Sequence, residues 1–310
     1  MPLYIFLSGL FFKASIGGGN FLIKKINNLI IPYLFFSLII IPLHYFLPEH
    51  YDVDMNDWKY YLFCFIEPFN VVLWFLRSLF IVNIIYFFLS KGIKNITKRI
   101  LVCFLLSILT WLITPFFRAN ENIILQWFLF NENIFSSLFA LPYIAIADWC
   151  KNKGILTCQI SLKKKCLFLI ISALLLMMFA IPGFDLRTAI FPDNLLYLYI
   201  SSFAGIFMVM MIARIFNKVF YLSYIGRYSL IVLGVHMIIK HETIINLHSD
   251  PWITAIINLA CAPIYIYILK KFFPYFTAQK PLLEYVDGRI VLPWNKQKHR
   301  SDHKTDSINH

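Results

Sequence analysis

Residues Leu29–Leu47 read LIIPYLFFSLIIIPLHYFL, an apolar stretch of 19 residues that contains no Asp, Glu, Lys or Arg. A helix rises about 1.5 Å per residue, and about 20 residues are needed to cross the roughly 30 Å hydrocarbon core of a bilayer. The stretch is therefore long enough to span a membrane. Because lipid cannot hydrogen-bond an exposed backbone, a helix is the conformation that we expect for it.

Similar stretches recur along the chain, and the composition agrees with them. Hydrophobic residues make up 60% of the sequence and charged residues 14%, against about 45–50% and about 25% in soluble proteins. The sequence predicts an all-α polytopic transmembrane bundle, with a short N-terminal helix and about eight full helices. These are expected near 29–47, 71–89, 100–117, 134–150, 166–182, 195–215, 228–246 and 252–269.

The segments between these stretches alternate in charge. Basic segments lie at 13–28, 91–99, 151–165 and 214–227 and in the tail from Lys270, and the segments between them carry the acidic residues. The positive-inside bias places the basic segments in the cytoplasm and predicts a multi-pass protein of the cell (inner) membrane. It also explains the net charge of +12, so we expect lipid and not nucleic acid as a partner.

The chain is expected to form one membrane domain, residues 1–294, and a disordered polar cytoplasmic tail, residues 295–310. Histidines in the tail are scattered, and the six cysteines form no CxxC pair. The sequence therefore predicts no metal site.

The first apolar stretch, Met1–Phe12, is too short to span a bilayer, because twelve helical residues reach only about 18 Å. Because the basic segment 13–28 follows this stretch, the positive-inside bias requires the stretch to run from outside to inside. A signal peptide has its basic residues before the apolar stretch, whereas here the lysines come after it. The sequence predicts that a preceding helix is missing from this chain. The alternative is a genuinely short or re-entrant N-terminus.

Five segments form a series of motifs: MPLYIFLSG at 1–9, FLIKKINNLIIPY at 21–33, LWFLRSLF at 73–80, LPY at 141–143, and YIGRYSL at 224–230 followed by His236. In this order they resemble membrane acyltransferases of the acyltransferase 3 family, which read MPLFFFISG, LLIPY, LWFLRxLF, LPFF and IGxxSLxILxxH. Within this family, the motifs look like those of the fucose 4-O-acetylase type. The resemblance covers most of the chain.

The resemblance implies a bundle of about ten helices and an O-acyltransferase. The enzyme would move an acyl group, usually acetyl, from cytoplasmic acyl-CoA to a hydroxyl of a cell-surface polysaccharide or its lipid-linked precursor. Acyl-CoA and the glycan are substrates, and no bound cofactor is implied. The family's central His and Arg on the first helix, and the His before MPLFF, would fall upstream of Met1, and their loss would leave this chain inactive.

Lys24 and Lys25 stand where the family has a basic pair at the cytoplasmic start of a helix, and the resemblance implies that they bind CoA. Simple positive-inside anchoring is the alternative. Asn27 and Asn28 replace basic residues of the family pattern, which favours anchoring.

Arg77 lies within an apolar stretch, where an arginine is costly and usually faces a partner or a wet cavity. We expect a functional or structural polar role for it. Trp74, one turn earlier, could stack on a sugar or acyl chain as a substrate-binding residue, or belong to the aromatic belt at the membrane interface.

Acyl transfer to a hydroxyl needs a base, and His236 is the remaining catalytic candidate for that role beside Arg77. Alternatively, His236 is a hydrogen-bonded packing residue. His44 is a similar candidate for the base, but it belongs to none of the motifs. Ser8 and Gly9 are predicted to let helices approach closely. Gly17–Gly19 is predicted to be a flexible turn, because no GK[ST] follows it.

Three other functions compete with the acyltransferase hypothesis. A transporter or flippase of lipid-linked sugars would often show repeated halves, and the sequence has none. A polysaccharide polymerase would typically show a long outer loop. The longest outer loop predicted for this chain, near residues 48–70, has only about 23 residues. The third is a non-catalytic remnant of an acyltransferase.

Overall fold

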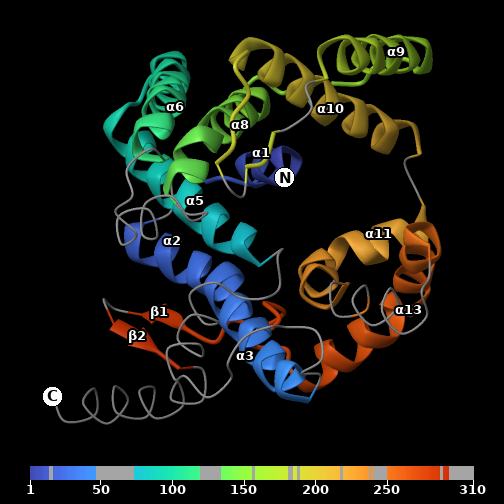
Figure 1. The fold of residues 1–310 in the computed structure, drawn as a ribbon. Coiled ribbons are helices and arrows are strands. Elements are labelled where there is room, and N and C mark those ends of the chain that lie inside the picture. The colour runs from blue at the N-terminus through green and yellow to red at the C-terminus, as the bar shows by residue number, and fades with distance from the viewer. Residues whose placement is uncertain are drawn as a thin grey trace, which may run out of the picture. The chain divides into compact units, whose positions relative to one another are not determined.

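The computed structural model describes residues 1–13, 17–46, 73–118, 134–155, 158–180, 184–186, 189–216, 219–236, 239, 250–286 and 289–292. These residues are mostly helical (Figure 1). The helices are α1 Pro2–Leu10, α2 Gly18–Lys25, the π-helix η1 Ile26–Ile30, α3 Ile31–Phe46, α5 Trp74–Gly92, α6 Ile96–Arg118, α8 Ile134–Asn152, α9 Leu162–Phe179, α10 Leu195–Ile215, α11 Phe220–Arg227 and α13 Pro251–Phe272.

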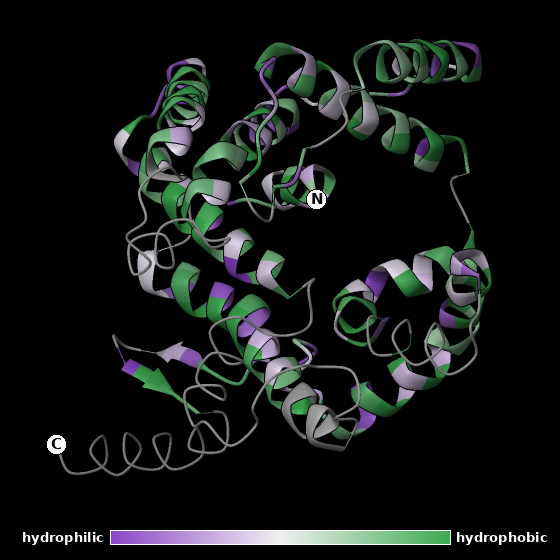
Figure 2. Cartoon of the chain, viewed as in Figure 1, coloured by the Kyte–Doolittle hydropathy of each residue, from purple (hydrophilic) through white to green (hydrophobic). Residues whose placement is uncertain are grey.

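The predicted polytopic helical bundle is confirmed. Within the described residues, six helical segments are long and apolar enough to cross a membrane: Gly18–Ile39, Trp74–Gly92, Ile96–Phe116, Ile134–Asn152, Leu195–Ile215 and Pro251–Phe272. Figure 2 shows hydrophobic residues along most of each long helix. The side chains of Leu101, Leu105 and Leu112 on α6 are 64%, 57% and 49% exposed in the protein alone, so lipid can cover this face.

Several helix boundaries differ from the predicted ones. The helical run of α2, η1 and α3 begins at Gly18, well before the predicted start near residue 29. Helices α6 and α9 likewise begin before their predicted starts and include lysines of the basic segments. The physical reason is that a charge-free stretch marks only the part of a helix that lipid can cover, whereas lysine and arginine are good helix formers.

Two further segments correct or limit the sequence prediction. Gly17 is the extended N-cap of α2, but Gly18 and Gly19 are helical, so the turn predicted at Gly17–Gly19 is wrong beyond its first residue. Residues 229–236 of the predicted helix 228–246 are helical. Most of its remainder, and the predicted tail 295–310, lie outside the described residues.

A short hairpin near the C-terminal end was not predicted. Strands β1 Glu284–Val286 and β2 Arg289–Val291 pair antiparallel, with Tyr285 opposite Ile290. Strand β1 lies against α2 (Figure 1). A Cβ added to Gly19 would be 2.6 Å from the ring of Tyr285. The absence of a side chain at Gly19 therefore allows the hairpin to contact the helix.

The chain forms two compact units. Unit 1 consists of Met1–Ala14 and Ser78–Ser223, and unit 2 of Ser15–Arg77 and Tyr224–His310. Each unit combines segments that are far apart in sequence, so each is held together by tertiary contacts.

In unit 1, α1 packs closely on α8. A Cβ added to Gly9 would lie 2.6 Å from both the backbone oxygen of Ile144 and the Cβ of Ala147. The hydroxyl of the neighbouring Ser8 donates to Oδ1 of Asn83 on α5 at 3.0 Å. The prediction that Ser8 and Gly9 allow a close helix approach is confirmed.

We expect Gly9→Ala to destabilise the protein by about 1–3 kcal/mol, because the added methyl overlaps a backbone atom that cannot rotate away. Thermal unfolding of the purified protein in detergent measures this change. Gly205→Ala on α10 is the matched control, since the nearest atom to its Cβ would be 3.8 Å away, at Leu176. Equal unfolding temperatures for the two variants would contradict the close contact.

Candidate functional site

The five site residues predicted from the sequence lie in one compact unit. Lys24 and Lys25 end α2, Trp74 and Arg77 lie in the first turn of α5, and His236 ends the helical stretch 229–236; all belong to unit 2. The long helical run from α2 to α3 provides the surface to which the other elements attach.

Arg77 faces an aromatic ring of α3. Its guanidinium carbon lies 5.4 Å from the centroid of the Tyr33 ring, within the distance at which a cation is attracted to an aromatic face. Tyr33 is 4% exposed, and Nε of Arg77 is buried. The arginine of this apolar stretch therefore contacts a protein partner, which the sequence did not identify.

Trp74 is buried. Its side chain is 5% exposed and its ring meets that of Phe75 edge to face, with centroids 6.2 Å apart. Little of the ring is left for a sugar or for the membrane interface in this structure. A role of Trp74 in binding substrate stays a prediction.

His236 is held by its own helix. Its Nδ1 lies 3.0 Å from the carbonyl oxygen of Val232 and 2.9 Å from that of Leu233. Because a carbonyl oxygen can only accept, Nδ1 carries the proton, and a neutral ring then has its lone pair on Nε2. The ring is half-buried. This tautomer is suitable for accepting a proton.

The residues before and around His236 are tied to two other helices of unit 2. A Cβ added to Gly234 would lie 2.5 Å from the ring of Phe36 on α3. Asn258 on α13 donates to the carbonyl oxygen of His236 at 3.1 Å. Phe36 lies one turn after Tyr33, so one short section of α3 contacts both Arg77 and the helix that carries His236.

Lys24 and Lys25 differ in their surroundings. Lys24 is exposed, whereas Lys25 is half-buried with its Nζ 5.5 Å from the centroid of the Phe21 ring. Lys25 precedes Tyr33 by about 12 Å along the helix axis, at about 1.5 Å per residue. The basic pair and the Arg77 contact thus lie on one helical run at different depths.

Asn27 has a structural role that the sequence did not reveal. It is 5% exposed and lies in the π-helix η1. Its amide nitrogen donates to the carbonyl oxygen of Leu283 at 2.7 Å, and its amide oxygen accepts from the backbone N–H groups of Leu282 and Leu283, each at 2.9 Å. The side chain thus fixes the segment before the hairpin to the helix. It stands at a position where the sequence resemblance implies a basic residue.

A buried ion pair in unit 1 was also missed. Nη1 of Arg99 on α6 lies 3.1 Å from Oδ2 of Asp148 on α8, and the two side chains are 8% and 7% exposed. The hydroxyl of Tyr86 on α5 donates to Asp148 at 2.8 Å. Asp148 falls inside a predicted membrane helix, so the same rule that identified Arg77 could have found it. Arg99 gave no such signal, because it was assigned to a basic segment.

His44 lies in α3, but its side chain is outside the part of the chain that the structure describes. Its competing claim as a base stays a prediction.

The fold and these contacts define a polytopic membrane protein in which Arg77 and the Arg99–Asp148 pair are packed between helices. The chain belongs to the acyltransferase 3 family: the family model described as an acyltransferase domain matches residues 1–269. No curated protein and no solved structure matches the chain. The predicted membrane acyltransferase is thereby confirmed at the level of the family, and the match gives no support for a transporter.

Proposed function

We propose that this protein is an O-acetyltransferase of the cell (inner) membrane. It transfers acetyl from acetyl-CoA to a hydroxyl of a cell-surface polysaccharide or its lipid-linked precursor. The observation that supports this proposal most directly is the family match over residues 1–269. The gathering of Lys24, Lys25, Arg77 and His236 in one unit supports it further.

In the proposed reaction, Nε2 of His236 accepts the proton of the acceptor hydroxyl. The hydroxyl oxygen forms a bond to the thioester carbonyl carbon, and the carbon–sulfur bond then breaks to release CoA as a thiolate. The histidine returns its proton to the thiolate, so that the products are an acetyl ester and free CoA. The positive charge of Arg77 stabilises the oxygen anion of the tetrahedral intermediate.

Lys24 and Lys25 bind the phosphates of CoA at the predicted cytoplasmic end of the same helical run. A lysine ammonium is a compact point charge that suits a phosphate. The acetyl group then extends along α3 toward the section that contacts Arg77.

The experiment that tests this function uses membranes from cells expressing the full chain and acetyl-CoA labelled in its acetyl group. We expect label in glycan as an ester that mild base releases. Membranes from cells with an empty vector are the control. Equal glycan label in the two preparations would contradict the proposed function.

We expect Lys24→Ala combined with Lys25→Ala to raise the KM for acetyl-CoA about tenfold and to change kcat little, because hydrogen bonds to charged groups contribute about 1.5–3 kcal/mol. The same variant should lose its preference for acetyl-CoA over the analogue without the 3′-phosphate. Lys13→Ala is the control, since Lys13 is an exposed lysine of the same predicted cytoplasmic side. If Lys24 and Lys25 only anchor the helix, the KM for acetyl-CoA and the KM for the analogue both stay unchanged.

We expect Arg77→Ala to lower kcat about 100-fold, which is typical when one group that stabilises an oxyanion is removed. Membrane insertion should persist, because the change removes a charge from an apolar stretch. Initial rates are compared at equal amounts of membrane-inserted protein, with Arg227→Ala at an exposed arginine of α11 as the control. A fully active Arg77 variant would remove this residue from the site.

A further inference from the structure

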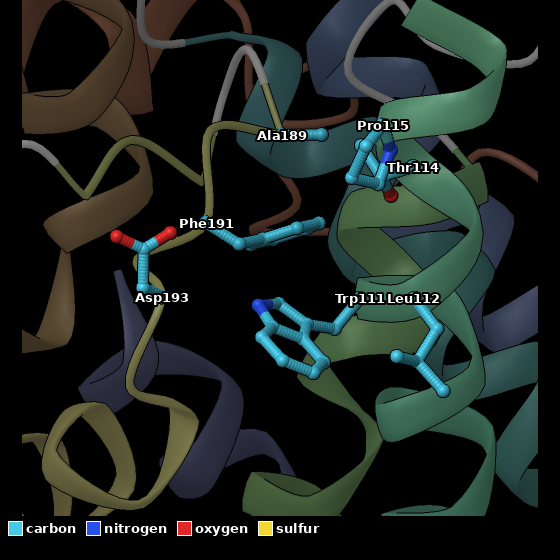
Figure 3. A pocket seen from close by; sticks show the side chains of 7 residues that line it. All are labelled: Trp111, Leu112, Thr114, Pro115, Ala189, Phe191 and Asp193. Carbon is cyan, nitrogen blue, oxygen red and sulfur yellow. The ribbon is translucent and has the colours of Figure 1, made fainter.

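Unit 1 contains a cavity that none of the predicted site residues lines. Its volume is about 250 Å³, and it lies between the last turns of α6 and the segment 189–193 before α10 (Figure 3). The lining side chains are Trp111, Leu112, Thr114, Pro115, Ala189, Phe191 and Asp193. The two elements are separated in sequence, so the cavity exists only in the folded chain.

The two aromatic rings of the cavity are fixed by contacts outside it. The indole N–H of Trp111 donates to the carbonyl oxygen of Pro192 at 2.9 Å. The ring of Phe191 stacks on that of Phe139, with centroids 4.1 Å apart and an angle of 17° between the planes. Phe139 is fully buried. A ligand therefore meets rings that are already oriented, which reduces the entropy lost on binding.

The backbone beside these rings is also constrained. Asp185 and Ile190 exchange two backbone hydrogen bonds, of 3.1 and 2.9 Å, which close the turn that leads into the segment. Ala189 has φ of 50° within this turn. A residue other than glycine in this left-handed region is strained, and such strain is often found at ligand sites.

The polar groups of the cavity can only accept, or prefer to accept, hydrogen bonds. Asp193 is exposed, and no residue of the described part of the chain donates a hydrogen bond to its carboxylate. The hydroxyl of Thr114 donates to the carbonyl oxygen of Thr110 at 2.6 Å, which leaves its lone pairs as acceptors. The cavity thus favours a ligand that offers hydrogen-bond donors.

A sugar ring has this chemistry. Its C–H face packs on aromatic rings, and its hydroxyls donate to a carboxylate and to a hydroxyl oxygen. A lipid acyl chain offers no donor to the Asp193 carboxylate or to the Thr114 oxygen. A phosphate-bearing ligand would be repelled by the same charge. The volume lies below the roughly 300–1,000 Å³ of sites for drug-sized ligands, so the cavity suits one ring and not a long oligosaccharide.

The predicted topology places this cavity at the outer face of the membrane, because Asp185 and Asp193 belong to an acidic segment opposite the lysine-rich ones. We propose that the Trp111–Phe191–Asp193 cavity binds one neutral sugar ring of an extracytoplasmic glycan. That this glycan is the acetyl acceptor rests on the proposed function, whereas sugar binding does not.

The test measures binding of methyl glycosides of glucose, galactose, fucose and N-acetylglucosamine by saturation-transfer NMR. The full chain is held in lipid nanodiscs, which avoids sugar-headed detergents. We expect at least one glycoside to bind. Asp193→Asn and Trp111→Ala should each weaken its affinity about tenfold, as loss of a hydrogen bond to a charged group does. Trp252→Ala should leave it unchanged, because Trp252 is 77% exposed at the start of α13.

Asp193→Asn changes an exposed side chain, so the test does not depend on the folding of the Trp111 variant. The proposal is wrong if no glycoside binds, or if the glycoside binds equally well to the wild type and to both variants. A cavity that is filled by a lipid chain would give one of these two results. No acetyl-CoA is present, so a chain without transferase activity can still bind the glycoside. If the wild type transfers acetyl to glycan but both variants bind the glycoside as the wild type does, the cavity proposal is wrong and the proposed function stands.

Discussion

Asp148→Ala is expected to reduce the free energy of unfolding by about 3–5 kcal/mol, because it leaves Arg99 buried without its counter-charge. The two side chains are less than a tenth exposed, and their nitrogen and oxygen atoms are 3.1 Å apart. Two backbone carbonyls, of Ile93 and Lys94, also accept from Arg99 at 3.2 and 3.4 Å. They orient the guanidinium but do not neutralise it.

The double variant Arg99→Met, Asp148→Leu should recover most of this loss, since apolar residues of similar volume often replace a buried ion pair at little cost. Recovery should be incomplete, because Tyr86 loses the oxygen that accepts from its hydroxyl. The measurement is the fraction of protein that elutes as folded after heating in detergent. Asp193→Ala is the control at an exposed acid. A melting temperature of Asp148→Ala equal to that of this control would show that the pair contributes nothing.

His236→Asn is expected to lower kcat about 100-fold or more, the contribution of a positioned general base. An asparagine amide nitrogen can take the place of Nδ1 and still donate to the carbonyl oxygens of Val232 and Leu233. It cannot accept a proton at neutral pH. The substitution therefore keeps the packing role of His236 and removes the proposed chemical one.

The measurement is kcat for acetyl transfer at saturating acetyl-CoA, with the KM for acetyl-CoA expected to change little. His236→Ala supplies a second test, since free imidazole should restore part of its activity if the missing group is a base. Wild-type kcat in the asparagine variant would show that His236 is a packing residue, which is the alternative that the sequence left open.

Much of the candidate site was predictable as a list of residues but not as an arrangement. Arg77 could be found from sequence because an arginine in an apolar stretch is unusual wherever it points. Its contact with Tyr33 could not, because the two lie on helices whose packing no local pattern specifies. The hydrogen bonds of Asn27 could not be predicted for the same reason, since its partners Leu282 and Leu283 lie far away in the sequence.

The sequence by itself determined that this chain forms membrane-crossing helices, and it indicated the family. Length, hydropathy and the need to satisfy backbone hydrogen bonds in lipid are properties of each segment alone, and they located Leu195–Ile215 without error. Only the tertiary structure decided the Arg99–Asp148 pair and the cavity between Trp111 and Asp193. Such contacts depend on the packing of segments that are distant in sequence, and hydropathy carries no information about which helix faces which.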